Sequence, residues 1–215
     1  MSVPLGLAIA LGLAVALNQA FRGIAWIRTA YFLPVVTSTI AIALVWQWIY
    51  SADSGLLNQV TGFFGIPAQK WLSNPTLAMP SIIAMSIWQG LGVNIIIFLA
   101  GLQAIPSEVL DAASVDGAAA WARFRRITVP LLTPAIFFTG VLSLIGSFQV
   151  FDQVFVLAKP KPTDATITVV YFIYESGFKF FKMGYASAAS WILFIIVAVF
   201  TAVYFQSQRR WVYYQ

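Results

Sequence analysis

Long apolar runs alternate with polar segments along this chain. None of the runs contains Asp, Glu, Lys or Arg, and they cover residues 3–17, 29–52, 77–102, 131–151 and 183–206. A helix crosses the core of a bilayer with about 20 apolar residues. The pattern therefore predicts an all-α integral membrane protein with about five visible transmembrane helices, in a single domain over residues 1–215.

The first two runs need separate arguments. Residues 3–17 have the length of a signal peptide, but no basic segment precedes them and no A-x-A cleavage site follows. We therefore interpret them as a membrane helix. In residues 29–52, Pro34 either begins the helix or kinks it. Trp46, Trp48 and Tyr50 lie near the far end of this run, where aromatic rings favour the membrane interface.

Two polar segments between the runs are predicted to lie on one side of the membrane. Residues 53–76 are rich in Gly, Pro, Asn and Ser, which indicates an exposed loop with a short interfacial helix. Residues 152–182 form a second exterior loop. Its apolar middle, residues 167–174, is too short to cross a bilayer.

Composition supports the membrane class. Hydrophobic residues make up 60% of the chain and charged residues 9%, with a mean hydropathy of +0.86, whereas soluble proteins carry about 25% charged residues. The net charge of +5 does not gather on a polar domain, so nothing indicates a nucleic-acid partner. Cysteine and histidine are absent, which excludes disulfides, thiol nucleophiles and most transition-metal sites, and we predict no metal site.

The basic residues predict the orientation of the chain. One side of the alternating runs carries seven of the 12 basic residues, all in short loops: Arg22, Arg28, Arg123, Arg125, Arg126, Arg209 and Arg210. The other side carries Lys70, Lys159, Lys161, Lys179 and Lys182, diluted by acidic residues. Since Lys and Arg are enriched in cytoplasmic loops, we predict that the arginine side and the C-terminus are cytoplasmic. The N-terminus then lies outside, and we expect a further helix before the first run.

Residues 106–134 form the one long segment that is rich in charge. Glu108, Asp111 and Asp116 come first, Gly117 follows, and the arginines come last. Glycine adopts positive φ without a Cβ penalty, so we predict two short helices, bent at Gly117 and lying outside the membrane, where another subunit binds them. From these features alone, an amphipathic helix pair resting on the bilayer surface is an equal alternative.

The spacing within this segment resembles the EAA loop of bacterial ABC-transporter membrane subunits. That pattern is Glu-Ala-Ala, three residues, Gly, nine residues and then I-x-L-P. Here Asp111-Ala112-Ala113 is followed after three residues by Gly117, and after nine more by Ile127-Thr128-Val129-Pro130. Asp111 replaces the usual glutamate and Val129 the usual leucine, and every spacing is kept.

Beyond the loop, nearly the whole chain resembles carbohydrate-uptake permeases of the maltose- and glycerol-phosphate-type group. The resemblance implies a six-helix permease core in a bacterial cytoplasmic (inner) membrane, with a cytoplasmic coupling loop at residues 105–130. It implies that the chain forms the path for a sugar or sugar-like solute, delivered by an extracytoplasmic binding protein. It also implies a second, related permease subunit and a cytoplasmic ATPase dimer as partners.

The chain itself is predicted to be a transport subunit and not an enzyme. It has no G-x-x-x-x-G-K-[ST] motif, so a separate ATPase uses the ATP and Mg, and this chain binds no cofactor. The residues that the resemblance assigns to ATPase coupling are Glu108, Asp111, Ala112, Ala113, Asp116, Gly117, Arg123, Phe124, Ile127 and Pro130.

Polar residues inside the runs are candidates for the substrate path, because polar groups that face lipid are costly. They are Gln47, Gln89, Asn94, Ser143, Ser147 and Gln149. Small residues at this spacing also let helices pack closely, which is the commoner reason for them. Ser143 and Ser147 share one helical face with Gly140.

Other classes of membrane protein fit the sequence less well. An ion-coupled secondary transporter or a channel subunit usually places ionisable residues at mid-membrane, and the runs contain none. An intramembrane enzyme needs nucleophiles, paired acids or metal ligands, which the runs also lack. A receptor or scaffold stays open from the physical features alone.

Overall fold

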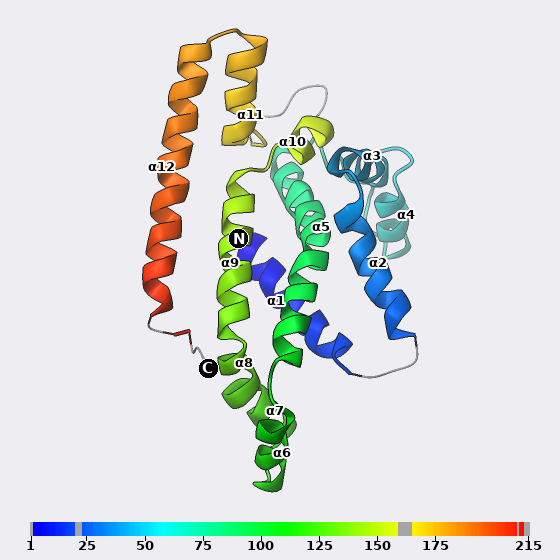
Figure 1. Ribbon diagram of the computed structural model, residues 1–215. Helices are drawn as coiled ribbons and strands as arrows, with labels where there is room; N and C mark the ends of the chain where they lie inside the picture. Colours follow the sequence, from blue (N-terminus) through cyan, green and yellow to red (C-terminus); the bar gives the residue numbers. More distant parts are fainter. Residues whose placement is uncertain (1, 20–22, 159–164, 210, 213–215) are drawn as a thin grey trace.

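The computed structural model describes residues 2–19, 23–158, 165–209 and 211–212, apart from the side chains of residues 24 and 25. All regular structure within these ranges is helical. The helices stand roughly side by side, and a smaller helical element extends beyond each end of the bundle (Figure 1). The prediction of an all-α membrane fold is therefore confirmed for the described part of the chain.

Helix α5, Pro75–Gln103, is the helix around which the others pack. Its 29 residues correspond to a length of about 43 Å. Pro75 occupies the first turn, and Asn74 caps it by accepting a hydrogen bond from the backbone N–H of Thr76 (3.0 Å). Helix α1, Ser2–Leu17, lies along α5, and α9, Thr133–Phe148, packs against both.

The buried core forms two clusters, one at each end of α5. In the first, Phe98 of α5 packs with Ala10 and Ala14 of α1 and with Leu132. In the second, Met85 packs with residues that include Val154 in α10, Asp152–Leu157, which lies against α3, Thr39–Ile49. The end of α5 at Gln103 therefore packs against α1 and α9, and the opposite end packs against α3 and α10 (Figure 1).

The apolar run 29–52 does not form one helix, so that prediction is wrong. It divides into α2, Ile24–Val36, and α3, and the axes of residues 26–36 and 39–49 differ by 105°. Thr37 is extended and Ser38 is non-helical, and the Thr37 hydroxyl donates to the carbonyl of Leu33 (2.8 Å). β-Branched residues are weak helix formers, and a threonine hydroxyl competes for the carbonyl that a continuing helix would use.

The other predicted runs correspond to helices with small differences at their ends. Helices α5 and α12, Met183–Gln208, are each long and apolar enough to cross a membrane. Up to four spans result if the bent pair α2–α3, and the pair formed by residues 120–131 and α9, which bends by 64°, each count as one. With 16 residues, α1 is a shorter apolar helix.

Both segments predicted as exterior loops contain helices. Residues 53–76 include α4, Leu56–Phe63, which agrees with the short helix predicted there. Residues 152–182 contain α10, α11 (Val169–Tyr174) and the π-helical turn η2 (Glu175–Lys179), and α11 runs beside the beginning of α12 as a hairpin (Figure 1). Thr168 caps α11 and also donates from Oγ1 to the carbonyl of Val150 (2.8 Å). Residues 159–164 lie outside the described part.

Helices α2 and α5 approach closely at Gly92. A methyl group at this position would lie 2.5 Å from Cγ2 of Val35 and would also meet the carbonyl oxygen of Tyr31. Small residues allow such close approach between membrane helices, where van der Waals contact supplies much of the association energy. Gly92 therefore fixes how α2 lies against α5.

We predict that Gly92→Ala destabilises the protein by about 1–3 kcal/mol, because overpacking forces the two helices apart. Thermal unfolding in detergent measures this as a fall in Tm of about 2–4 °C per kcal/mol. Gly90→Ala is the matched control two residues away, since a methyl group there meets nothing within 4 Å. Equal Tm values for the two variants would contradict the proposed close contact.

Candidate functional site

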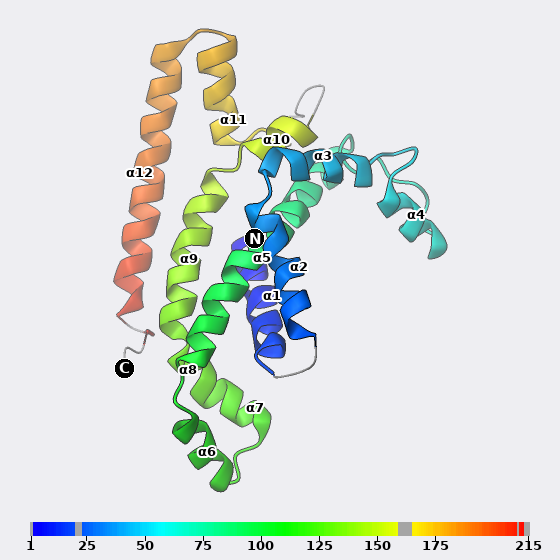
Figure 2. The same cartoon turned by 45° about the vertical axis from the view of Figure 1, so that its right-hand side comes forward.

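Gly117 bends the charged segment as predicted. Helix α6, Ser107–Val115, ends there, and Gly117 has a φ of 75°. The N–H of Ala118 donates to the carbonyl of Ala113 (3.0 Å) and the N–H of Gly117 to that of Ser114 (3.1 Å). This pair of bonds is the Schellman motif, which ends a helix and turns the chain sharply. The chain then returns toward the bundle through α7, Ala120–Arg123 (Figure 2).

The acidic residues of the bend face away from the protein. The side chains of Glu108, Asp111 and Asp116 are exposed at the tip of the molecule, whereas Ala113 is buried on the inner side of α6. Arg123 donates from Nη1 to Oγ of Ser114, so a hydrogen bond joins the two arms of the bend. Ala112 is exposed beside the acidic residues. The outer side of α6 thus combines a small side chain with negative charge. We call this outer side of residues 107–116 the acidic surface.

The second arm of the bend contains a π-helical turn. In η1, Phe124–Thr128, the N–H of Val129 bonds to the carbonyl of Phe124. Pro130 has no N–H to donate, and α8, Val129–Leu131, ends directly afterwards. Such single π turns occur frequently at functional sites. The Ile127-x-x-Pro130 sequence therefore coincides with irregular helix geometry and not with an ordinary α-helix.

Phe124 and Ile127 are half-buried, and Phe124 lines a groove of about 360 Å³ between α1, α5 and the bend. The ring of Trp121 lies 5.5 Å from that of Phe124, yet Trp121 is 70% exposed. The second arm thus presents one aromatic side chain inward and one outward.

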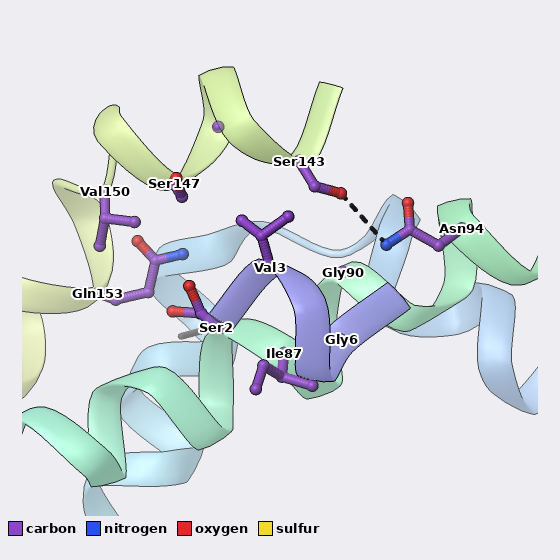
Figure 3. A pocket seen from close by; sticks show the side chains of 12 residues that line it. Ser2, Val3, Gly6, Ile87, Gly90, Asn94, Ser143, Ser147, Val150 and Gln153 are labelled. Atoms are coloured by element: carbon purple, nitrogen blue, oxygen red, sulfur yellow. Dashed lines mark hydrogen bonds between the residues drawn. The ribbon is translucent and has the colours of Figure 1, made fainter. Parts of the chain in front are cut away.

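A polar cleft lies between α1, α5, α9 and α10, with a volume of about 220 Å³. Figure 3 shows Asn94, Ser143, Ser147 and Gln153 facing it. The other residues that line it are Ser2, Val3, Gly6, Ser86, Ile87, Gly90, Gly146 and Val150. None of the 12 carries a charge, so the cleft offers hydroxyl and amide groups on an apolar wall.

Three of the six path candidates lie in this cleft, namely Asn94, Ser143 and Ser147. Asn94 donates to Oγ of Ser143 over 3.5 Å, a long and therefore weak bond. Gln47 lies elsewhere and donates from Nε2 to the carbonyl of Val156 (3.3 Å), which joins α3 to α10. Gln149 is exposed at the end of α9 and does not line the cleft. Neither Gln47 nor Gln149 therefore lines the cleft.

Gln89 is one hydrogen bond away from the cleft. It donates from Nε2 to Oγ1 of Thr39 (2.9 Å), and its Oε1 accepts from Nε2 of Gln153 over 3.5 Å. This amide chain, Thr39–Gln89–Gln153, links α3, α5 and α10 at the edge of the cleft. The polar side chains therefore connect the bend between α2 and α3 to the cleft wall.

Three polar residues of the cleft, Ser2, Ser86 and Gln153, were missed from the sequence. Ser86 could have been found, because it lies four residues before Gly90 and eight before Asn94, on the same face of α5. Gln153 had no such signal, since it stands in a segment predicted as an exterior loop. Its position follows from the contacts of α10 with α3 and α5.

The architecture just described is that of a transport subunit: membrane helices enclose an uncharged polar cleft, and a bent, charged element extends beyond the bundle. The chain belongs to the family of binding-protein-dependent transport system inner membrane components, whose model matches residues 3–212. The predicted resemblance to permeases of this kind is confirmed. As a member, the chain is a permease subunit and not an enzyme.

Curated relatives agree with this assignment. The chain is 41% identical over 99% of its length to the probable ABC transporter permease protein YesP of Bacillus subtilis (strain 168), of which it covers 70%. It is 34% identical over 98% of its length to the lactose transport system permease protein LacF of Rhizobium radiobacter, of which it covers 72%.

The fold also matches a solved structure, a bacterial alginate ABC transporter in complex with an alginate pentasaccharide-bound periplasmic protein. The TM-score is 0.89 at 24% identity, over 97% of this chain and 74% of that chain. At this identity the match establishes the fold alone.

The bond between Gln89 and Thr39 gives a stability prediction. Removing both partners in a double-mutant cycle of Gln89→Leu and Thr39→Val should show a coupling of about 0.6 kcal/mol, the average for side-chain hydrogen bonds between membrane helices. Unfolding in mixed micelles measures the free energies. The pair Gln47→Leu and Thr39→Val is the control and should be additive, because Gln47 bonds to Val156 instead. Additivity in both cycles would show that the Gln89–Thr39 bond contributes nothing.

Proposed function

We propose that this chain forms half of the path of an ATP-driven importer for an uncharged sugar or sugar-like solute. The observation that carries this is the chemistry of the cleft, where serine, asparagine and glutamine side chains lie on an apolar wall without a charged group. Hydroxyl and amide groups exchange hydrogen bonds with the hydroxyls of a sugar, whereas a charged solute needs a paired charge. The lactose relative supports the same substrate class.

The solute reaches the cleft from an extracytoplasmic binding protein, and a second, related permease supplies the other half of the path. Family membership supports the binding protein, because the family is defined as binding-protein-dependent. For uptake to be coupled, the loaded binding protein and ATP must each favour one conformation of the permease over the other. A carrier without ATP coupling, such as a secondary transporter or channel, is disfavoured by family membership.

The acidic surface of α6 is the docking site for a separate ATPase dimer, which uses the ATP and Mg. Glu108, Asp111 and Asp116 are exposed and project beyond the bundle, where basic groups of a partner can reach them. The small side chain of Ala112 allows the ATPase to approach α6 closely. Arg123, together with the bend at Gly117, holds the two arms in one geometry, and Phe124, Ile127 and Pro130 join the second arm to the bundle.

This function requires α6 and the C-terminus to be cytoplasmic. The described basic residues support that orientation, since Arg28, Arg125, Arg126 and Arg209 belong to the end of the bundle that carries α6, while Lys70, Lys179 and Lys182 belong to the other end. A hydrogen bond to Glu175 (2.8 Å) raises the pKa of Lys179 above its usual value, so that lysine stays charged. Arg22, Lys159, Lys161 and Arg210 lie outside the described residues.

Filling the cleft should block transport. We expect Ser143→Leu to lower uptake of the transported sugar about tenfold or more, because an overpacked site costs about 1–3 kcal/mol. A panel of labelled neutral and acidic sugars, tested with the assembled transporter in vesicles, identifies the substrate first. Ser190→Leu is the control, since Ser190 is exposed on α12 away from the cleft. Unchanged uptake by Ser143→Leu, or preferred uptake of acidic sugars, would contradict the assignment of the cleft.

Removing the bend should uncouple the ATPase. Gly117→Pro forces φ to about −65° where the chain needs 75°. We expect ATPase activity stimulated by the binding protein to fall about tenfold or more, since a backbone mismatch costs about 1–3 kcal/mol. Gly65→Pro makes the same change at a φ of 74° in the other end of the molecule and should keep the stimulation. If Gly117→Pro assembles and transports normally, the coupling role is wrong.

A further inference from the structure

Helix α4 turns its apolar side away from the protein. Leu56, Val60, Phe63 and Phe64 follow one another at intervals of four, three and one residues, which places them on one helical face. All four are exposed, and the two phenylalanines are 88% and 80% exposed. An amphipathic helix on a water-soluble surface shows the reverse arrangement, with its apolar stripe against the core.

The inner side of α4 is held by one asparagine. Asn58 donates from Nδ2 to the carbonyls of Ala52 and Gln69 (3.0 Å each), and its Oδ1 accepts from the N–H of Gln69 (3.0 Å) and from Nε1 of Trp71 (2.8 Å). These bonds satisfy the whole amide. They fix the rotation of α4, so the outward direction of the apolar stripe is a property of the folded chain.

The position of α4 shows what its apolar stripe contacts. Helix α4 follows α3 in the chain and lies level with the upper part of α2 in both views (Figures 1 and 2). At that height α2 itself exposes Leu33 (61%) and Val36 (64%), as a membrane helix does toward lipid. Residues 54–69 contain no charged side chain, so nothing on the stripe complements a charged protein surface.

We propose that α4 is a membrane anchor, whose stripe of Leu56, Val60, Phe63 and Phe64 inserts into the lipid leaflet at the end opposite α6. Amphipathic helices with aromatic and aliphatic residues on one face bind at the boundary of headgroups and acyl chains. Helix α4 stands at the same height as the exposed upper part of α2 (Figures 1 and 2), so the same leaflet covers both.

This anchor acts on the outer end of the bundle. Asn58 ties α4 to the turn after α3, and α3 packs on α10, which carries Gln153 into the cleft. Insertion of α4 therefore holds the broken end of the α2–α3 span at a fixed depth in the leaflet. This anchoring role is separate from solute transport and does not depend on the identity of the solute.

The absence of cysteine in the chain allows a direct test. Single cysteines are introduced as Phe64→Cys, Val60→Cys and Leu56→Cys, spin-labelled in the full-length assembled transporter, and reconstituted in phosphatidylcholine–phosphatidylglycerol vesicles. Collision rates with lipid-soluble oxygen and with a water-soluble nickel complex are then measured. Two controls are Asp53→Cys, an exposed charged position in the loop before α4, and Gly62→Cys on the opposite face of α4, where an added side chain meets nothing within 4 Å.

At position 64 we expect the ratio of lipid to aqueous collisions to be about tenfold or more above that at position 53, because inserting the one remaining phenyl side chain, that of Phe63, favours the lipid by such a factor. The ratio should decrease from 64 through 60 to 56, since α4 descends toward its C-terminal end (Figure 2), and should be lower at 62, on the opposite face, than at 60. Ratios at 64 equal to those at 53 would overturn the proposal, and so would protection of position 64 from both reagents, which would show a protein partner on the stripe.

Discussion

A bilayer core contains no water, so every backbone N–H and C=O in a spanning segment needs a partner within the protein. This constraint explains where the helices of this permease are broken. The interruption at Thr37 and Ser38 is accompanied by the Thr37 hydroxyl bond to Leu33, and the interruption after α9 by the Thr168 bond to the carbonyl of Val150. Both breaks lie beside the amide chain Thr39–Gln89–Gln153 at the edge of the cleft. Irregular backbone and solvated polar groups thus occupy the same layer of the molecule.

Two rigid helices join that layer to the acidic surface. Helix α5 carries Asn94 in the cleft and reaches Gln103, four residues before α6 begins. Helix α9 carries Ser143 and begins directly after the π turn and Pro130. In the proposed function, a displacement of the bend reaches both walls of the cleft along α5 and α9, while the turn at Gly117 and the 64° bend before α9 change the direction of the chain. Coupling between an ATPase and a transport path requires a mechanical connection of this kind, and the proposed function assigns it to α5 and α9.

Much of this organisation could be predicted from the sequence, because a bilayer imposes length and polarity on each segment. The apolar runs located α1, α5, α9 and α12, and the glycine at 117 located the bend. The break in residues 29–52 was not predicted, since the run carries no charge and its one proline precedes the break by three residues. Gln153 was also missed, because only the packing of α10 against α3 brings a residue of a polar segment into the cleft. Such positions depend on tertiary contacts, which leave no periodic pattern in the chain.

The chemistry of the cleft also fits the demands of transport as opposed to tight binding. The bonds from Asn94 to Ser143 and from Gln153 to Gln89 are both 3.5 Å long, at the weak limit of hydrogen bonding. If the cleft carries the proposed solute, side chains held this loosely lose little when a hydroxyl of that solute replaces their partner, and they regain the bond when the solute leaves. Charged groups at these positions would bind a complementary solute more tightly and would need compensation in the empty cleft. A lining of amide and hydroxyl groups therefore keeps the free-energy cost small both for binding the proposed solute and for releasing it.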